Sequence, residues 1–449
     1  MRTPLLDTAR AELIAKTPNC RAMSQARAEI LNSGLAANSE MPHPIFLESG
    51  AGCRVTDADG NTYIDTSVGF GLHMLGHRHP VILDAIVARA HKGWMFGIHS
   101  TAQLPLAQLL QEAIPCAERI VFCNTGTEAT FYAIRAARAF TGRDGIALFD
   151  GAYHGAHDYG MVVADPSSPV NAMRTLPMGR GIPKAVQSLV RMLPYRHAAA
   201  FDAIRRHKDE LALVMIEGVQ SSNPQTEIAD FLAELRDVCR ACDVLLMFDE
   251  VITGFRLDYA GAQGMFGVTP VLATYGKVIG GGMPVGAIAG RADLMDVFTG
   301  LAGGRGIFSG GTFSGNPMTM AAGTAAVGHL HEHPEIYRHL NAEGDRLAQA
   351  INTFCATRQM PVHMNNAGSM FHLFFQRAPV ATARDIRASH VPAQSAFYLH
   401  ALNRGVLVPG TQRAFLCAAH TPADVDTLIS VFQESLLATQ TDGLFEDKT

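Results

Sequence analysis

The chain of 449 residues lacks any uninterrupted apolar run close to the roughly 20 residues that a membrane-spanning helix needs. Its first sixteen residues, MRTPLLDTARAELIAK, contain five charged side chains, so they also lack the apolar core of a signal peptide. We therefore expect a cytoplasmic protein that does not use a membrane as a partner.

Charged residues are also few, and neither sign dominates. Asp, Glu, Lys and Arg make up only 17% of the residues, the formal net charge is −5, and Lys and Arg form no long run. Nucleic acids and anionic membranes bind basic surfaces, so neither is an expected partner. The 48% content of hydrophobic residues predicts a well-packed globular protein instead, with a length that allows two or three domains or subdomains.

The cysteine and histidine patterns predict no metal site. The eight cysteines include one C-x-x-C pair, Cys239 and Cys242, which ends a helical pattern and has no second pair to complete a zinc site. Three histidines cluster in GLHMLGHRHP, residues 71–80, where glycine and proline predict a loop and no nearby carboxylate completes a ligand set. We expect an ordinary helix end at the first motif and a loop at the second.

Several short apolar runs end in polar or glycine-rich turns and are followed by helical patterns. Strands that are apolar on both faces and alternate with helices are typical of a largely parallel sheet covered on both sides. The sequence therefore predicts an α/β fold. The expected strands lie near residues 119–123, 145–149, 211–216, 244–248 and 285–289, and a helix is expected over about 127–140.

The two ends of the chain have a different pattern. Residues before about 60 predict a small hairpin region with its turn at DADGNTY, and residues after about 325 predict long helices with shorter strands. We expect a large central domain and a smaller domain built from both chain ends. The predicted divisions are 1–65 and 326–449 for the smaller domain and 66–325 for the large domain.

Two polar segments follow predicted strands, where open parallel sheets bind ligands. Thr125, Gly126 and Thr127 open a helix, whose free N–H groups and positive dipole end suit a phosphate. The same residue types are also common as simple helix caps. Tyr153 and His154 occupy a glycine-bounded turn, where the tyrosine ring could stack on a flat ligand or pack in the core.

Two charged residues complete this set. Asp249 follows the apolar run VLLMF, and a buried carboxylate there needs a cationic partner, such as the protonated ring nitrogen of a ligand. Lys277 is the single charged residue of LATYGKVIGGGMPVGAIAG, and a lysine in a water-poor pocket is a nucleophile towards aldehydes. The glycines here follow the lysine and match no nucleotide-binding loop. A phosphate cradle, a stacking ring, a carboxylate and a reactive lysine together predict pyridoxal 5′-phosphate as the cofactor.

The motifs NTGTEAT, FDGAYHG, FDEVITGFR, GKVIGGGMPVGA and GGTFSGNP resemble those of the class III pyridoxal-phosphate aminotransferases, with glutamate-1-semialdehyde aminomutase as the nearest branch. The resemblance extends from ESGAGCRVTDADGNTYIDT to AAHTPADVDTLI, which is most of the chain. It implies fold type I, with a large domain around a mostly parallel central sheet and a smaller α+β domain from both chain ends.

The same resemblance implies roles for the candidate residues. Lys277 would form the internal aldimine and move protons, and Asp249 would keep the pyridine nitrogen protonated. The Thr125–Thr127 segment would bind the phosphate, and Tyr153 would stack on the ring. Thr312 in GGTFSGNP would reach the phosphate of the neighbouring subunit, which implies a homodimer with shared active sites.

Departures from the aminomutase pattern fall at substrate contacts. The aminomutase segment G-G-V-N-S-P-V-R, whose Ser and Arg hold the substrate carboxylate, has no counterpart here, because residues 28–53 contain no arginine. Its acidic P-S-x-F-E segment is matched by VPGTQRAFLCAAHT, which offers Arg413 as a substitute cation. Phe70 replaces a tryptophan beside the cofactor. Trp94 could line the substrate pocket or pack, and His154 is a further candidate contact.

The sequence therefore predicts an aminotransferase that moves an amino group between an amine donor and a carbonyl compound other than glutamate-1-semialdehyde. The family's range includes amines, β-amino acids and amino sugars. The aminomutase itself and a pyridoxal-phosphate-dependent epimerase remain alternatives. A non-catalytic binding protein is disfavoured because Lys277 and Asp249 are both present.

Overall fold

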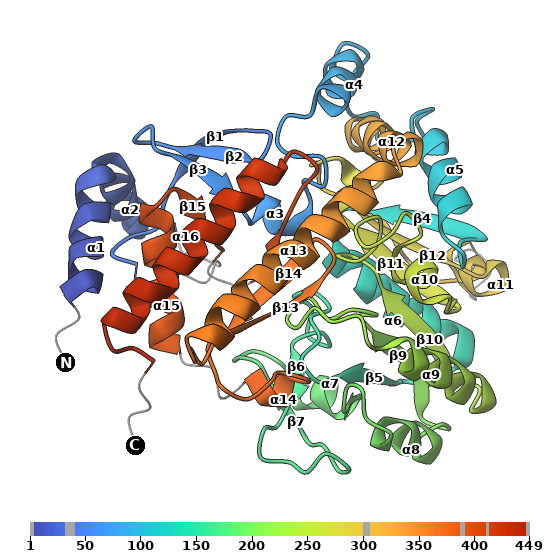
Figure 1. Cartoon of the computed structure of the whole chain (residues 1–449). Helices are drawn as coiled ribbons and strands as arrows, with labels where there is room; N and C mark the ends of the chain where they lie inside the picture. Colours follow the sequence, from blue (N-terminus) through green and yellow to red (C-terminus); the bar gives the residue numbers. More distant parts are fainter. Residues whose placement is uncertain (1–3, 32–40, 300–305, 387–390, 410–412, 446–449) are drawn as a thin grey trace. The chain divides into compact units, whose positions relative to one another are not determined.

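The computed structural model describes residues 4–31, 41–299, 306–386, 391–409 and 413–445 (Figure 1). The chain forms two compact units. The sheet unit comprises Pro80–Tyr337 and Thr382–Arg384, and the terminal unit comprises Met1–His79, Arg338–Ala381 and Asp385–Thr449. The domain boundaries predicted at residues 65 and 325 stay predictions.

The sheet unit is built around a seven-stranded sheet with the order β4-β12-β11-β10-β9-β5-β8. Neighbouring strands from β11 to β8 run parallel, and β12 is antiparallel to both β11 and β4. The predicted mostly parallel α/β sheet is therefore confirmed. Its strands are β4 (Arg119–Cys123), β5 (Gly145–Phe149), β8 (Val190–Leu193), β9 (Leu211–Ile216), β10 (Leu245–Asp249), β11 (Leu272–Gly276) and β12 (Gly286–Gly290).

Helices and one small hairpin complete the sheet unit. The hairpin consists of β6 (Val162–Ala164) and β7 (Thr175–Pro177). The α-helices are α4 (Pro80–Ala90), α5 (Gln103–Ala113), α6 (Gly126–Thr141), α7 (Lys184–Ser188), α8 (Ala199–Arg206), α9 (Ala229–Ala241), α10 (Gly261–Phe266), α11 (Ala292–Met295) and α12 (Pro317–Glu332), and two 3₁₀ turns are η1 (Lys277–Gly280) and η2 (Asp296–Phe298).

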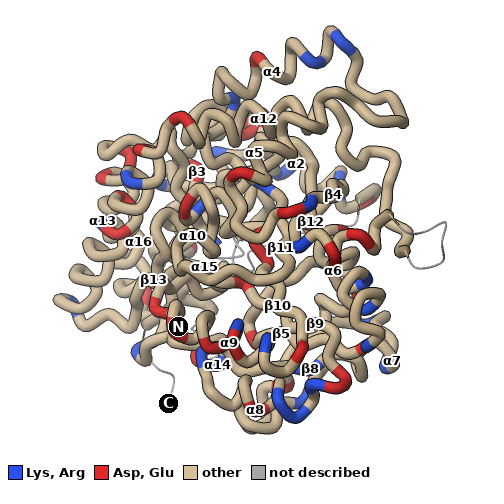
Figure 2. Tube along the Cα trace, turned by 90° about the vertical axis from the view of Figure 1, so that its right-hand side faces the viewer, with Lys and Arg blue, Asp and Glu red and all other residues tan. Residues whose placement is uncertain are grey.

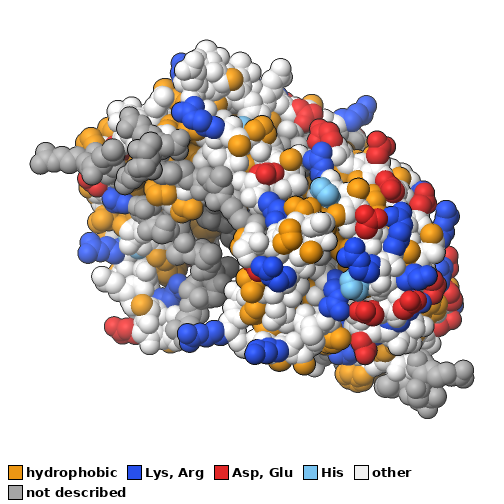
Figure 3. Space-filling view, turned by 90° about the horizontal axis from the view of Figure 1, so that it is seen from below, with side chains coloured by type: hydrophobic (Ala, Val, Ile, Leu, Met, Phe, Trp, Pro, Cys, Tyr) orange, Lys and Arg blue, Asp and Glu red, His pale blue; other side chains and the backbone are white. Residues whose placement is uncertain are grey.

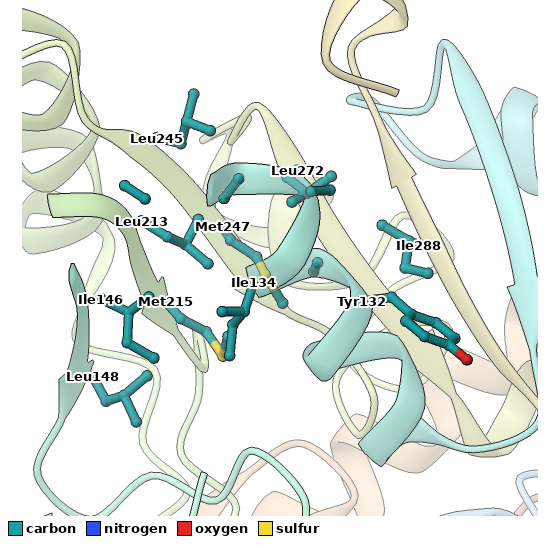
Figure 4. Packing of buried hydrophobic residues seen from close by; sticks show 14 of the residues in the cluster. Tyr132, Ile134, Ile146, Leu148, Leu213, Met215, Leu245, Met247, Leu272 and Ile288 are labelled. Carbon is teal, nitrogen blue, oxygen red and sulfur yellow. The ribbon is translucent and has the colours of Figure 1, made fainter. Parts of the chain in front are cut away.

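The core of the sheet unit lies between α6 and the central strands (Figure 4). Helix α6 buries Ala129, Ala133 and Ala136 at helical spacing, together with Tyr132 and Ile134. The small alanine side chains let the helix approach the sheet, whose facing residues are large and apolar. These facing residues include Ile146, Leu148, Leu213, Met215, Leu245, Met247, Leu272 and Ile288.

The expected strands and the expected helix are present, with bounds that differ by at most one residue from those predicted. The sequence did not predict β8 or β11. Strand β11 is fully buried, but its sequence, LATYG, runs directly into a glycine cluster that conceals the strand pattern. The C-x-x-C motif ends α9, with Cys242 as the C-cap and both thiols free, as the helix-end interpretation predicted.

The terminal unit contains two small sheets, ordered β1-β2-β3-β15 and β13-β14-β16. The turn predicted at DADGNTY joins β2 to β3, which pair antiparallel. The strands are β1 (Leu47–Ala51), β2 (Arg54–Asp57), β3 (Thr62–Asp65), β13 (His363–Ala367), β14 (Met370–Phe374), β15 (Val406–Leu407) and β16 (Ala414–Phe415). The helices are α1 (Pro4–Lys16), α2 (Pro18–Ile30), α3 (Val68–Gly71), α15 (Val391–Asn403) and α16 (Pro422–Thr441), with α13 (Glu335–Thr357) and α14 (Ala383–Ile386) at the unit boundaries.

Charged residues of both signs are scattered along the trace, and both signs occur together on the face seen in Figure 3 (Figures 2 and 3). Several neighbouring charges form ion pairs, such as Arg143 with Asp243 at 2.7 Å and Arg191 with Glu210 at 3.0 Å. Within the described residues, no helix has the length and apolar character required to cross a membrane.

Two glycines of α12 provide a test of how this helix is packed. A Cβ at Gly323 would overlap the carbonyl oxygen of Ile279 in η1, whereas a Cβ at Gly328 would meet only Leu109 Cδ1, at 3.9 Å. We expect Gly323→Ala to lower the free energy of unfolding by about 1–3 kcal/mol through overpacking. Gly328→Ala should leave it unchanged or raise it by up to about 1 kcal/mol through helix propensity. Denaturant unfolding of both variants measures this difference, and equal effects would contradict the packing.

Candidate active site

Asp249 and Lys277 lie at the carboxyl ends of two adjacent parallel strands of the central sheet. Asp249 is the last residue of β10, and it pairs in register with Thr274 of β11. Lys277 comes three residues after Thr274 and opens η1, with a half-buried side chain. Carboxyl ends of parallel strands meet at one edge of a sheet, so the chain brings an acid and an amine to the same edge.

The backbone at Lys277 has an uncommon conformation. Its φ angle is +49°, in the left-handed region that a residue with a long side chain rarely adopts. The turn is closed by Gly281, also at positive φ, whose N–H donates to the Val278 carbonyl. Such strain persists only where surrounding structure fixes the chain, and it concentrates at functional sites. The lysine is therefore placed by a tight turn directly after a buried strand.

The Asp249 carboxylate is buried and accepts hydrogen bonds at both oxygens. Oδ1 accepts from the Val251 N–H and from the Thr274 hydroxyl, each at 3.1 Å. Oδ2 lies 2.7 Å from Nδ1 of His154. A buried carboxylate is stable only when such donors replace its lost water, so the structure holds an oriented anion at this point.

The neighbouring acid, Glu250, has a structural role. Its carboxylate accepts from the Thr253 hydroxyl at 2.6 Å and from the N–H groups of Ala262 and Gln263 at 2.9 and 3.1 Å. Burial raises the pKa of Glu250, against these hydrogen bonds, which lower it. Glu250 thus organises the start of α10, and Asp249 is the acid of the pair that lies beside Thr274 and His154.

The N-terminus of α6 is a candidate anion site whose hydroxyls already have partners. Thr125 is the N-cap, and its hydroxyl accepts from the Glu128 N–H at 3.0 Å. The first N–H groups of a helix have no partner within the helix, so they can receive an anion. Gly126 lets Val251 approach, because a Cβ at Gly126 would lie 2.8 Å from Val251 Cγ1. The cap interpretation is thus confirmed for Thr125, while phosphate binding stays a prediction.

The turn after β5 is attached to α6. The Thr127 hydroxyl accepts from the Ala156 N–H at 3.2 Å, and the Thr130 hydroxyl donates to the His154 carbonyl at 2.7 Å. Gly155 has a φ of +94°, and a Cβ there would lie 2.8 Å from both Cα and Oγ1 of Thr127. A glycine is therefore required where the turn approaches the helix, and the turn is held against the candidate anion site.

Tyr153 is placed by a carboxylate that sequence analysis left without a role. The Tyr153 N–H donates to Glu217 Oε2 at 3.1 Å, and Glu217 is buried directly after β9. The Tyr153 side chain is 39% exposed, so it is not a core residue and its ring is accessible for stacking. Glu217 was expected only to shape the site, and Thr274 was not predicted, because their partners are set by the strand order, which no local pattern shows.

The other predicted residues have no described contact with this cluster. Thr312 is exposed and lines a cavity of about 550 Å³ with residues 95–99, and its lining contains none of Asp249, Lys277 and Tyr153. Trp94, just before that segment, is 64% exposed, which excludes packing in the core of this chain. Phe70 and Arg413 belong to the terminal unit, so their contacts with substrate stay predictions.

His154 is buried and its described side-chain contact is with Asp249, while its predicted contact with substrate stays a prediction. The chain thus presents an oriented buried anion, a strained lysine directly after the next strand, an exposed aromatic ring and a helix N-terminus. These residues fit pyridoxal 5′-phosphate, which needs an acid for its ring nitrogen, an amine for its aldehyde and N–H donors for its phosphate.

Two glycines at nearly equal positive φ test the contact between the turn and α6. Gly155 and Gly181 have similar positive φ values, +94° and +97°, but a Cβ at Gly181 meets nothing within 4 Å. We expect Gly155→Ala to weaken the binding of pyridoxal phosphate at least about tenfold, which corresponds to 1.4 kcal/mol. The Gly181→Ala variant should bind pyridoxal phosphate with the same affinity as the unmodified chain. Equilibrium titration measures both, and equal affinities would contradict this account.

Known proteins share this architecture along nearly the whole chain. The glutamate-1-semialdehyde 2,1-aminomutase of Methanoculleus marisnigri is 36% identical over 400 residues, covering 88% of this chain and 94% of its own. An omega-transaminase from Sphaerobacter thermophilus superposes with a TM-score of 0.87 at 32% identity, covering 94% of this chain and 98% of its own.

Two further solved structures are similar. A β-phenylalanine aminotransferase from Variovorax paradoxus superposes with a TM-score of 0.83 at 31% identity and 96% coverage of both chains. A transaminase with pyridoxal phosphate bound gives a TM-score of 0.84 at 29% identity, covering 95% of this chain and 99% of its own. The family model for aminotransferase class-III matches residues 35–421. The chain therefore belongs to the class-III aminotransferases.

Proposed function

We propose that this protein is an aminotransferase that uses Lys277 to move an amino group between an amine donor and a carbonyl acceptor. The family and its solved members give pyridoxal 5′-phosphate as the cofactor. The observation that carries the proposal is the placement of Asp249 and Lys277 after adjacent parallel strands, with the acid buried and held by three donors.

Each residue of the cluster has a task that its surroundings support. When bound, the cofactor supplies an electron sink for the carbanion that forms when a substrate loses its Cα proton. Asp249 provides a fixed negative charge for the ring nitrogen, the α6 N-terminus binds the phosphate, and Tyr153 covers the ring. The Lys277 amine would hold the cofactor through its aldehyde, and it would move the proton at the substrate Cα.

The substrate proposal is an amine, a β-amino acid or an amino sugar. It is supported by the missing arginine in residues 28–53, where the aminomutase holds its substrate carboxylate. Similar folds occur in an omega-transaminase and a β-phenylalanine aminotransferase. Arg413 is our proposed contact for a substrate carboxylate, and Phe70 and Trp94 are proposed apolar contacts.

The aminomutase activity is the second candidate, because a relative of that name is 36% identical along 88% of this chain. It requires the same Asp249 and Lys277 chemistry and differs only in returning the amino group to the same carbon skeleton. An epimerase would need only removal and return of a Cα proton. These three reactions share one cofactor site, so the site supports all three and the substrate contacts distinguish them.

We also propose a homodimer with shared active sites, in which the partner's Thr312 reaches the cofactor phosphate. Apolar side chains around Thr312 are exposed in the single chain, which suits a surface that a second copy covers. Phe308 and Phe313 are 66% and 62% exposed, and Trp94 is 64% exposed. The cytoplasmic location expected from the sequence remains part of this proposal.

The first test is the half-reaction with amino donors. Purified protein loaded with pyridoxal phosphate is mixed with a panel of amines, β-amino acids and amino sugars, and its visible absorption is followed. At least one donor should convert the cofactor to its amine form, and a carbonyl acceptor should restore the original absorption. Lys277→Ala should show no catalytic turnover with the same donor, because it lacks the amine that carries the proton.

Three outcomes separate the candidates. Conversion of glutamate-1-semialdehyde to 5-aminolevulinate without an added donor would assign the aminomutase. Entry of solvent deuterium at Cα without amino transfer would assign an epimerase. Absence of any absorption change with the whole panel, in protein that has bound the cofactor, would contradict transamination.

The second test is subunit complementation. Lys277→Ala removes the amine from both sites of a dimer, and Thr312→Ala removes the proposed phosphate contact from both. A mixed dimer with one subunit of each variant should contain one site with an intact Lys277 and the partner's intact Thr312. We expect this dimer, isolated with two different affinity tags, to recover about half of the unmodified activity. No recovery above the Thr312→Ala dimer would contradict the shared site.

A further inference from the structure

The last turn of α12 carries two histidines whose rings lie side by side. His329 belongs to this turn, and His333, four residues later, is the C-cap of the helix. Their ring centroids are 4.2 Å apart and their planes are tilted by 40°. Both residues are partly exposed, so a solute can reach the pair. The pair lies outside both motifs from which the sequence predicted no metal site.

The separation of the two rings suits a shared metal ion. An imidazole nitrogen binds zinc at about 2.0–2.1 Å, so two imidazoles on one ion have ring centroids about 4.5–5 Å apart. The observed 4.2 Å is close to this value. Small rotations about the side-chain bonds therefore bring one nitrogen of each ring to a common ion, without a change in the helix backbone.

Glu335, the first residue of α13, orients the ring of His333. Its Oε1 lies 2.8 Å from His333 Nδ1. An acceptor at Nδ1 keeps the proton of a neutral ring there, and the ring then presents a lone pair at Nε2. Metal-binding histidines almost always donate their other N–H to a carboxylate, a carbonyl or water in this way. The Ile336 N–H donates to the His333 carbonyl at 3.1 Å, so the backbone of the turn is fixed as well.

The electrostatics of this helix end favour one cation over two. The last carbonyl groups of a helix carry partial negative charge, which attracts a cation. Two protonated histidines four residues apart would repel each other, whereas two neutral rings that share one ion would not. His331 lies between them in sequence, and its ring is 5.3 Å from that of Tyr259. Residues two apart do not face each other on a helix, so His331 is not expected to join the pair.

We infer that His329 and His333 form a binding site for one divalent transition-metal ion at the C-terminal end of α12, with Glu335 as the carboxylate that orients His333. Imidazole ligands suit zinc, nickel and copper, and water would complete the coordination. The inference does not depend on the proposed function, because it uses none of the residues assigned to the cofactor or the substrate.

A second group of metal-ligating side chains lies in the terminal unit, where Cys20, Asp57 and Asp59 are close together. Its carboxylates already have donors. Asp59 accepts from the N–H groups of Asn19 and Cys20 at 2.7 and 2.9 Å, and Asp57 accepts from the Tyr63 hydroxyl at 2.8 Å. These contacts cap the start of α2, so the group has a structural role that requires no ion.

The site is tested by calorimetric titration of the full chain with nickel chloride. Nickel is the probe because zinc is also selected by thiolates, and the chain has eight cysteines. We expect one bound ion per chain. His329→Asn and His333→Asn should each weaken the binding at least about tenfold, since loss of either ring replaces a chelate by a single ligand.

His331→Asn is the matched control, because it removes an imidazole from the same helix turn and should leave the affinity for nickel unchanged. Glu335→Gln should weaken the binding about ten- to a hundredfold, as the loss of a carboxylate behind a metal-binding histidine typically does. Unchanged affinity in His329→Asn or His333→Asn, or an equal loss in His331→Asn, would overturn the site. Unchanged affinity in Glu335→Gln would overturn the orienting role of this carboxylate.

The position of the ion is measured without any substitution, by anomalous scattering at the nickel edge from crystals of the full chain grown with one equivalent of nickel. We expect the main peak between the rings of His329 and His333. A main peak at Cys20 and Asp57 or elsewhere, or no peak at all, would overturn the inference even if a histidine variant failed to fold.

Discussion

The structure depends on the parallel register of β10 and β11. Asp249, the last residue of β10, pairs with Thr274 of β11. Lys277 comes three residues after Thr274, so the acid and the lysine lie at the ends of adjacent strands. Burial of the Asp249 carboxylate is costly unless donors replace its lost water, and the strand ends place those donors and the half-buried Lys277 at one edge of the sheet. The cofactor proposed here would bring its ring nitrogen to the acid and its aldehyde to the amine.

The surrounding elements fix this edge by close backbone contacts. Gly126 admits Val251 beside the start of α6, Gly155 lets the Tyr153 turn approach Thr127, and Gly323 brings α12 against the segment that follows Lys277. Each contact excludes a Cβ, so each ties a site residue to a rigid element. Positioning of this kind is what a catalytic site requires, because small displacements of reacting groups are expensive in rate.

The sequence indicated the cofactor chemistry because an isolated charged residue within an apolar segment is unusual and has to be explained. Asp249 after VLLMF and Lys277 amid glycines both departed from their surroundings, and the structure places them at one edge of the sheet. It did not identify strand β11, because LATYG merges with the glycine cluster. It also missed Thr274 and the hydrogen bond of Glu217 with the Tyr153 backbone. Those errors share one cause: the partners follow from strand order and register, which join residues far apart in sequence.

The sequence resemblance identified the family but not the substrate. Family membership rests on the whole chain, whereas specificity depends on a few contacts such as Arg413, which lies in the terminal unit. A carboxylate-binding arginine can be supplied from a different part of a chain without changing the fold, so overall identity does not report it. The same sheet edge therefore supports transfer, mutase and epimerase chemistry, and substrate contacts choose among them.

The most direct test of the central claim is the location of the covalent bond. The protein loaded with pyridoxal phosphate is reduced with borohydride and digested, and the peptides are analysed by mass spectrometry. The account predicts that the added mass lies on Lys277, and that replacing Asp249 with Ala strongly reduces the amount of labelled peptide. Labelling of a different lysine, or of none in protein that has bound the cofactor, would contradict it.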